Sequence, residues 1–301
     1  MNGVLVIDKP AGFTSFDVIA VVRKLTGQRK TGHTGTLDPN ATGVLPVLLG
    51  SATKAQDILP DRDKSYTAGF QLGLRTDTLD VWGEELERVN TDISEEAVQR
   101  ALEKFRGEIM QVPPMYSAIK KNGKRLYDLA RQGVEVEREA RPVTVYRLEL
   151  ASFSREEQRG VLEIKCSKGT YVRTLIDDIG AALGVGAVMT ALRRTSACGY
   201  TLEDCVTLDE LKALSESGAI GERLRPVESL FTTSYKSLTV SEAQAKRFKN
   251  GAALDISRTA LRGRDIAENT VFRIKDPSNA FLGLGIASDG MIKIYKLFAE
   301  R

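Results

Sequence analysis

The sequence has 301 residues, of which 42% are hydrophobic and 28% charged, and its formal net charge is +3. Such a chain can bury a sizeable core, so its composition excludes wholesale disorder. The single histidine excludes a metal site built on two histidine ligands, and the three cysteines follow no zinc or redox spacing.

Several common sequence signatures are missing. The sequence contains no Walker loop, no complete dinucleotide-binding glycine fingerprint and no hydrolase nucleophile elbow. Nucleotide hydrolysis, nicotinamide chemistry and metal catalysis therefore lose support. No segment reaches the roughly 18 consecutive apolar residues of a membrane helix, and the apolar run at 4–7 is too short for a signal peptide. We therefore expect a cytoplasmic protein with reduced cysteines and no membrane contact.

The first quarter of the chain predicts alternating strands and helices. The expected elements, in order, are a strand at 3–7, a helix from about 15 to 27, a strand at 44–49, a short helix at 53–59 and a strand at 66–74. The first helix is predicted from a cap at Thr14 or Ser15, an end at Gly27 and apolar residues at helical spacing. These apolar residues are Phe16, Ile19, Ala20 and Val22.

The middle of the chain continues this mixture. The expected elements are a helix capped by Ser94, a short helix at 124–132, paired strands at 143–153 and 161–166, a helix at 174–183 and a helix opened by the capping box at 207–210. Residues 112–142 are rich in Pro, Gly and charge, which predicts an insertion that closes over a ligand like a thumb.

The last part of the chain has a different texture. Residues 229–236 hold few strong helix or strand formers and are the candidate linker. A short helix at 241–251 and strands at 271–275, 281–287 and 291–298 are expected beyond it. From residue 240 onward, eleven Lys and Arg stand against seven Asp and Glu. This pattern predicts a small, mildly basic β module.

Two clusters of cations adjoin glycine-rich segments. Their members are Arg23, Lys24, Arg29 and Lys30 in the first cluster, and Lys120, Lys121, Lys124, Arg125 and Arg131 in the second. Each cluster alone is equally explained as a solvated surface. Together, beside glycine-rich loops, they favour a surface for a phosphate backbone.

The most unusual segment is the Gly- and Thr-rich run at 32–43, which carries Asp38 followed by Pro39. Glycines let a ligand approach the backbone closely, and threonines can orient an acid or bind phosphate. The segment thus predicts a loop that presents one carboxylate. The alternative is an ordinary turn in which Asp38 caps local amides.

This run resembles the signature of the bacterial TruB-type tRNA pseudouridine-55 synthases. Further matching segments follow in the same order and spacing across essentially the whole chain. They are residues 5–10, 63–66, 72–78, 113–120 and 166–173. The resemblance implies a pseudouridine-synthase fold of the α+β class, with a mixed, largely antiparallel sheet, flanking helices and a thumb-like insertion. It implies a catalytic domain at 1–235, with the insertion at about 112–142, and an RNA-binding domain similar to a PUA β-barrel at 236–301.

The resemblance also implies roles for individual residues. Asp38 matches the catalytic aspartate, Arg173 an arginine that pairs with it, and Tyr66 a tyrosine that stacks under the uracil and helps remove the C5 proton. A guanidinium beside a carboxylate favours its charged form and fixes its orientation. The expected contacts to substrate RNA are His33, Tyr171, Lys9, Lys64, Lys168, Gly35 and Thr36.

The reaction implied is the isomerisation of uridine 55 in the T-loop of tRNA, after the base has been flipped into a pocket. Isomerisation involves no net redox change or group transfer, so no cofactor and no metal are expected. The expected partner is the T-arm of tRNA, bound by a monomer without a guide RNA. The family pattern leaves open whether Asp38 attacks C6, attacks C1′ or generates a glycal.

Three other functions compete with this one. A non-catalytic tRNA-binding or tRNA-folding protein would share the architecture, but the presence of Asp38, Arg173 and Tyr66 argues against it. Modification of another uridine, or modification directed by a guide RNA, would keep the enzyme class. A small-molecule hydrolase would need a nucleophile and base that the sequence does not supply.

Overall fold

The structure, a computed structural model, describes residues 1–121 and 123–299. The α-helices are α1 (Ser15–Thr26), α2 (Glu95–Glu103), α3 (Leu126–Ala130), α4 (Val172–Ala182), α5 (Leu208–Glu216) and α6 (Glu242–Lys249). Short 3-10 helices lie at Gly50–Ala55, Leu202–Asp204, Ile220–Arg223, Val227–Phe231 and Ile256–Arg258.

The strands fall into two main groups along the chain. The first group comprises β1 (Gly3–Lys9), β2 (Thr31–His33), β3 (Thr42–Leu49), β4 (Lys64–Leu72), β5 (Leu74–Thr76), β6 (Glu85–Arg88), β7 (Gly107–Gln111), β8 (Lys120–Lys121), β9 (Lys124–Arg125), β10 (Arg141–Ser154), β11 (Arg159–Cys166), β12 (Ala187–Ala197) and β13 (Tyr200–Thr201). The second comprises β14 (Lys236–Thr239), β15 (Leu254–Asp255), β16 (Val271–Lys275), β17 (Phe281–Ser288) and β18 (Met291–Leu297).

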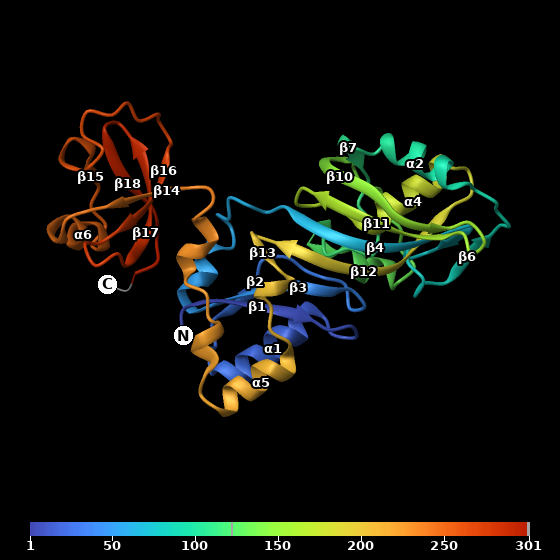
Figure 1. The fold of residues 1–301 in the computed structure, drawn as a ribbon, viewed down its shortest axis with the longest axis horizontal. Coiled ribbons are helices and arrows are strands. Elements are labelled where there is room, and N and C mark those ends of the chain that lie inside the picture. Colours follow the sequence, from blue (N-terminus) through green and yellow to red (C-terminus); the bar gives the residue numbers. More distant parts are fainter. Residues whose placement is uncertain (122, 300–301) are drawn as a thin grey trace.

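A nine-stranded sheet forms the larger part of the molecule. Its strands run in the order β1-β3-β12-β4-β11-β10-β7, with β2 added to β3 and β13 to β12. All pairs are antiparallel except β3 with β12, which are parallel where Arg194 meets Gly43. Figure 1 shows the sheet bridging two groups of helices, α1 with α5 at one end and α2 with α4 at the other. The mixed, largely antiparallel sheet with flanking helices confirms the α+β class.

Each helix pair covers its own hydrophobic core. Helices α1 and α5 pack with β1 and β3 in a core that includes Val18, Leu45 and Leu211. Helices α2 and α4 pack with β4, β10 and β11 in a second core, which includes Leu102 and Ile176. The loop that carries Asp38 contributes Leu37 to this second core, so the candidate site lies where the two halves of the sheet meet.

The first helix forms where the sequence predicts it, but two of its apolar residues face solvent. Thr14 and Asp17 form a capping box, and Gly27 ends the helix in the left-handed conformation. Val18, Ile19 and Val22 are buried. Phe16 and Ala20, which belong to the apolar pattern that predicts the helix, are exposed. The inward position of the first turn is taken by the small residue Ser15.

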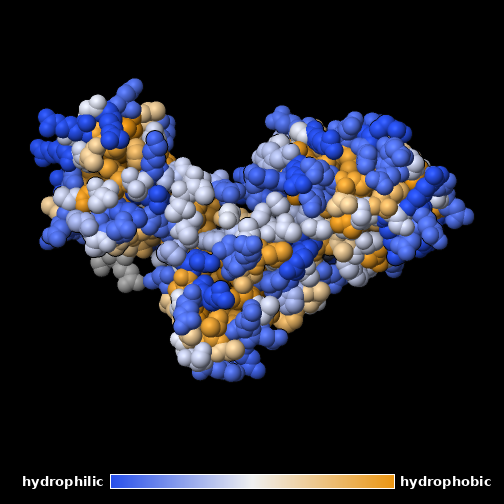
Figure 2. All heavy atoms as spheres, in the orientation of Figure 1, coloured by the Kyte–Doolittle hydropathy of each residue, from blue (hydrophilic) through white to orange (hydrophobic). Residues whose placement is uncertain are grey.

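A smaller five-stranded sheet has the strand order β14-β16-β17-β18-β15. It lies at the end of the molecule opposite to α2 and α4 (Figure 1). It has its own core, which includes Phe248, Ile274 and Leu282. In the space-filling view an open notch separates this lobe from the lobe built on α2 and α4, and hydrophilic residues cover much of both (Figure 2).

The candidate linker at 229–236 is more ordered than the sequence suggests. Phe231 is completely buried, and its ring contacts those of Phe281 and Phe298 from the second sheet. Glu228 pairs with Arg273 and, at 3.1 Å, with Lys275. The segment is therefore part of a shared core rather than a free linker. A boundary between domains at 235/236 stays a prediction.

Among the residues that the structure describes, none of the helices combines the length and apolarity needed to cross a membrane.

Candidate active site

Asp38 lies in the loop between β2 and β3, close to the start of α1. Ser15 ties this loop to the helix: its Oγ accepts a hydrogen bond from the Leu37 amide at 2.9 Å and donates one to the Leu37 carbonyl at 3.3 Å. The amide of Gly12 donates to the carbonyl of Pro39 at 3.0 Å. The backbone on both sides of Asp38 is therefore fixed by the segment that leads into α1.

Two buried cations donate hydrogen bonds to the main chain of the same loop. Lys9 donates to the carbonyls of Pro10, Phe13 and Pro39 at 2.9, 2.5 and 2.9 Å. Its side chain is inaccessible, and burial lowers its pKa to about 8, an effect that the charge of Asp38 opposes. The expected phosphate contact of Lys9 is therefore wrong, because the ammonium is enclosed and all three of its donors are used on the backbone.

Arg194, on β12, is the second buried cation. Its Nε donates to the carbonyl of Val44 at 2.7 Å, and its Nη2 donates to the carbonyl of Gly35 at 3.2 Å. Gly43 makes this approach possible. Its φ is +100°, and a Cβ at this position would lie 2.2 Å from the carbonyl oxygen of Arg194. No other residue fits there without moving the strand that carries Arg194.

Arg173 lies directly behind Asp38. Its Nε is 3.0 Å from Oδ2 of Asp38, so the structure brings these two predicted residues together. The arginine side chain is 6% exposed, whereas that of Asp38 is 42% exposed. The guanidinium is thus enclosed, and the carboxylate it holds is open to a ligand.

Arg173 also binds two other segments. Its Nη1 donates to the carbonyl of Thr78 at 2.9 Å and its Nη2 to the carbonyl of Tyr116 at 2.8 Å. Oδ2 of Asp80 lies 3.9 Å from Nε of Arg173. Burial raises the pKa of Asp80, while a hydrogen bond from Thr78 and the charge of Arg173 oppose this rise. One guanidinium therefore joins the Asp38 loop, the loop after β5 and the segment after β7.

Two tyrosines from the predicted set lie on elements that border the site. Tyr66 is on β4, opposite Arg194 of β12, and is buried. Burial raises its pKa to about 12, against the opposing charge of Arg194, so its phenol is protonated at neutral pH. Tyr171 precedes α4, where the Gln111 side chain bonds to both its amide (2.7 Å) and its carbonyl (3.1 Å). Tyr171 is half-buried, and burial raises its pKa.

His33 ends β2, and its ring meets that of Phe16 edge-on, with 5.9 Å between the ring centroids. Its Nδ1 is buried and has no hydrogen-bond partner among the described residues. Burial lowers the pKa of His33, and the nearby charge of Arg194 lowers it further. Phe16 is 65% exposed. A large apolar ring thus stands in solvent beside the loop that carries Asp38.

The remaining predicted residues differ in accessibility. Lys64 is half-buried and donates to the carbonyl of Arg62 at 2.8 Å, and burial lowers its pKa. Lys168 is exposed in the turn before α4. Gly35 is half-buried and Thr36 is exposed in the Asp38 loop. Their roles as RNA contacts stay predictions.

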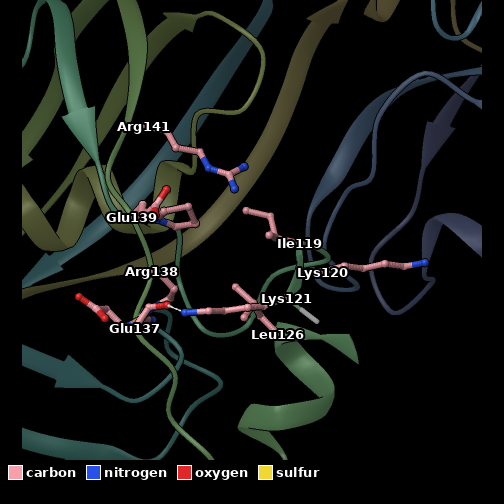
Figure 3. A pocket seen from close by; sticks show the side chains of 9 residues that line it. Ile119, Lys120, Lys121, Leu126, Glu137, Arg138, Glu139 and Arg141 are labelled. Carbon is pink, nitrogen blue, oxygen red and sulfur yellow. Dashed lines mark hydrogen bonds between the residues drawn. The ribbon is translucent and has the colours of Figure 1, made fainter. Parts of the chain in front are cut away.

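The segment expected as an insertion runs between the adjacent strands β7 and β10, and carries β8, β9 and α3. A hollow of about 200 Å³ lies at its base, where Lys120, Lys121, Arg138 and Arg141 are among the lining residues (Figure 3). Lys121 donates to the carbonyl of Glu137 at 2.5 Å. These four cations share the lining with Glu137 and Glu139, so the depression carries more basic than acidic side chains.

Comparison with known proteins decides the family. The model of the TruB family pseudouridylate synthase N-terminal domain matches residues 23–172, and that of the tRNA pseudouridylate synthase B C-terminal domain matches residues 173–232. A tRNA pseudouridine synthase B from Burkholderia mallei is 45% identical over 292 residues, covering 97% of this chain and 95% of its own length. The chain belongs to the TruB family. It is therefore a pseudouridine synthase, an isomerase.

Other TruB relatives extend this similarity. A tRNA pseudouridine synthase B from Clostridium perfringens is 42% identical and both chains are covered completely. One from Lactobacillus delbrueckii subsp. bulgaricus is 46% identical over 87% of this chain and 90% of its own. Because the alignments span nearly the full chain, the family assignment includes the second sheet.

Solved structures show the same fold. A chain in an H/ACA RNP bound to a substrate RNA containing 2′-deoxyuridine aligns with a TM-score of 0.74 at 25% identity, covering 99% of this chain and 86% of its own. A chain of a Cbf5-Nop10-Gar1 complex aligns with a TM-score of 0.74 at 27% identity, covering 99% and 85%. The expected pseudouridine-synthase fold is thus confirmed.

Three residues of this TruB-family site were missed in the sequence. Arg194 follows the apolar run at 187–189 and was not recognised as part of a strand. Two adjacent arginines, Arg193 and Arg194, normally indicate a surface. The burial of Arg194 depends on Gly43, which is distant in sequence. Tyr116 lies in one of the segments that match the family pattern, and Asp80 lies two residues after another. That match marks both regions, but nothing in the sequence indicates that these two residues lie next to Arg173.

Proposed function

We propose that this chain is a stand-alone tRNA pseudouridine synthase that converts uridine 55 of the T-loop to pseudouridine. The names of the relatives that match it at 42–46% identity over most of its length support tRNA as the substrate. The single observation that carries the catalytic role is the contact of 3.0 Å between the enclosed Arg173 and the half-open Asp38.

The reaction requires one charged carboxylate. The N1–C1′ bond breaks, the uracil turns, C5 bonds to C1′, C5 loses its proton and N1 gains one, so atoms and electrons balance without a co-reactant. Asp38 acts on the flipped nucleoside as nucleophile or base, and both roles need the ionised form. Arg173 pairs with the carboxylate at 3.0 Å and aims it, since its guanidinium is held by two backbone carbonyls.

Tyr66 and Tyr171 are proposed to supply two walls of the uracil pocket. A phenol whose pKa is about 12 keeps its proton at neutral pH. It therefore stacks against the base and donates a hydrogen bond more readily than it removes the C5 proton. Flipping a stacked base costs a few kcal/mol, which stacking of this kind offsets.

The RNA backbone is proposed to contact the exposed cations around the site. These include Lys168 and the basic side chains around the hollow in the insertion (Figure 3). Lys64, His33, Gly35 and Thr36 complete the proposed contacts near the base. We propose that the protein needs no guide RNA, because relatives aligned over nearly the full chain carry the name of a tRNA enzyme. We also propose that it works as a monomer in the cytoplasm.

The test uses unmodified tRNA that carries tritium at C5 of its uridines. Wild-type protein is expected to release tritium, the modified position is expected to map to uridine 55, and Asp38→Asn is expected to release none. Tight tRNA binding without release by the wild type would instead support a binding or folding protein. Release that maps to another uridine would keep the enzyme class and reject the proposed position.

A further inference from the structure

Tyr116 lies where the insertion leaves the sheet, five residues after the end of β7. It makes two polar contacts with the rest of the molecule. Its carbonyl accepts a hydrogen bond from Nη2 of Arg173 at 2.8 Å. Its hydroxyl donates to Oδ2 of Asp77 at 2.9 Å. Main chain and side chain of one residue thus bind the catalytic arginine and the loop after β5.

Asp77 is itself part of a closed turn. Its Oδ1 accepts from the amide of Glu84 at 2.8 Å. Inside this turn, Oγ1 of Thr78 donates to Oδ1 of Asp80 at 2.7 Å. The carbonyl of Thr78 accepts from Nη1 of Arg173 at 2.9 Å. The two carbonyls that hold Arg173 therefore come from two segments, and the Tyr116–Asp77 bond is a direct link between them.

The orientation of Arg173 follows from this link. A guanidinium is planar, so fixing both of its Nη groups also fixes the direction in which Nε points. Nε is the donor that reaches Asp38. A shift of the Tyr116 carbonyl would rotate the guanidinium and move the N–H away from the carboxylate.

The same segment leads into the basic insertion. The carbonyl of Ser117 accepts from the amide of Tyr127, and the carbonyl of Ile119 accepts from the amide of Leu126, so the root of the insertion is bonded to the region of α3. Ser117 and Leu126 are buried. A displacement of the insertion is thereby carried to the residue next to Ser117.

We propose that Tyr116 is a positioning residue, whose hydroxyl bond to Asp77 keeps Arg173 aimed at Asp38 and makes that aim depend on the position of the insertion. The inference rests on the proposed function for its kinetic consequence. It accounts for two segments, at 72–78 and 113–120, that the catalytic roles of Asp38, Arg173 and Tyr66 leave unexplained. RNA that engages the insertion would thus also order the carboxylate.

The test removes only the hydroxyl, with Tyr116→Phe. The rate of a single turnover on tritiated tRNA is expected to fall roughly tenfold, since a hydrogen bond to a charged group is lost. The dissociation constant for tRNA is expected to change less than about twofold, because no proposed RNA contact is removed. Asp77→Asn in the Tyr116→Phe background is expected to add little further loss, because the two side chains share one bond.

Tyr200→Phe is the matched control. It removes a tyrosine hydroxyl whose oxygen lies 2.6 Å from Oγ of Ser229, away from the site. It is expected to lower thermal stability about as much as Tyr116→Phe does, while leaving the single-turnover rate unchanged. Equal rates for Tyr116→Phe and wild type, or a loss seen only in tRNA binding, would overturn the proposal.

A second measurement does not depend on the reaction. Amide hydrogen exchange of the uncomplexed protein should become faster in Tyr116→Phe both at 76–84 and at 115–119, and in neither segment in Tyr200→Phe. Unchanged exchange at 76–84 would refute the link even in an active enzyme. If the wild type released no tritium but exchange changed as expected, the proposed function would fail and the structural link would stand.

Discussion

Lys9 and Arg194 approach the Asp38 loop from two different strands and bind its main chain on both sides of the aspartate. Lys9 holds the carbonyl of Pro39, one residue after Asp38, and Arg194 holds the carbonyl of Gly35, three residues before it. Both side chains are completely buried. The carboxylate thus stands on a loop that is clamped at each end by a cation without access to solvent.

Arg194→Lys should damage the protein far more than the same change at its neighbour. A lysine has no planar fork and cannot reach both Val44 and Gly35, so buried carbonyls would lose their donor. Each such loss costs about 1–3 kcal/mol, and we expect a fall in stability of about 2–4 kcal/mol together with lower activity. Arg193→Lys is the control, because Arg193 is partly exposed and pairs with Asp8 at 2.7 Å. It should change stability by less than about 1 kcal/mol in urea unfolding. Equal effects would refute the clamp.

Arg173→Lys should separate catalysis from binding. A lysine keeps the charge but cannot bond to Asp38 and to the carbonyls of Thr78 and Tyr116 in one geometry. We expect kcat to fall roughly 10²-fold to 10³-fold because the carboxylate loses its orientation. The dissociation constant for tRNA should change little, since Arg173 is enclosed. A variant that loses binding but retains kcat would show that Arg173 is an RNA contact instead.

Phe16→Ala should weaken RNA binding without slowing the chemical step. Stacking of a base on an exposed aromatic ring is worth about 1–3 kcal/mol, which corresponds to roughly 5-fold to 150-fold in the dissociation constant. Phe16→Tyr keeps a ring and should bind nearly as well as wild type. Leu86→Ala removes an equally exposed apolar side chain from β6 and serves as control. Equal affinity of Phe16→Ala and wild type, by fluorescence anisotropy of labelled tRNA, would exclude the stacking contact.

Asp178→Asn should stabilise the protein near neutral pH. Burial and the neighbouring charge of Asp177 raise the pKa of Asp178 from 3.8 to about 6. Between pH 3.8 and about 6 the native state holds a proton that the unfolded chain has released. The contribution of this group to stability is therefore full below pH 3.8 and is lost as pH rises through 6. After allowance for partial exposure, we expect Asp178→Asn to gain about 1–2 kcal/mol at pH 7 and nothing at pH 3.5. An equal gain at both pH values, in urea unfolding, would contradict this origin.

Local patterns predict most of the elements that build the site, but few of its long-range contacts. The cap at Thr14, the strand that contains Tyr66 and the helix that begins at Val172 all follow from residues close to one another in the sequence. The pairing of Asp38 with Arg173 was expected only from the resemblance to a family, because 134 intervening residues separate two side chains that meet through the sheet.

The residues that were misjudged show the same limit. Lysine is usually a surface residue, and only the fold places three carbonyls around the ammonium of Lys9. Phe16 satisfies the helical spacing, but the small Ser15 takes the inward position since its hydroxyl binds Leu37. Phe231 lies in a weakly patterned segment, and its burial depends on two rings from the second sheet.

The core around Phe231 also bears on how the chain can be shortened. It contains Val4 and Leu48 from the first sheet together with Leu284 and Phe298 from the second, so neither part closes it alone. A version that stopped at residue 235 would present this apolar surface to water and would be expected to aggregate. Loss of the second sheet would therefore need compensating polar substitutions on the first. A chain of this family that keeps the apolar residues of the first sheet is thus expected to keep the second sheet as well.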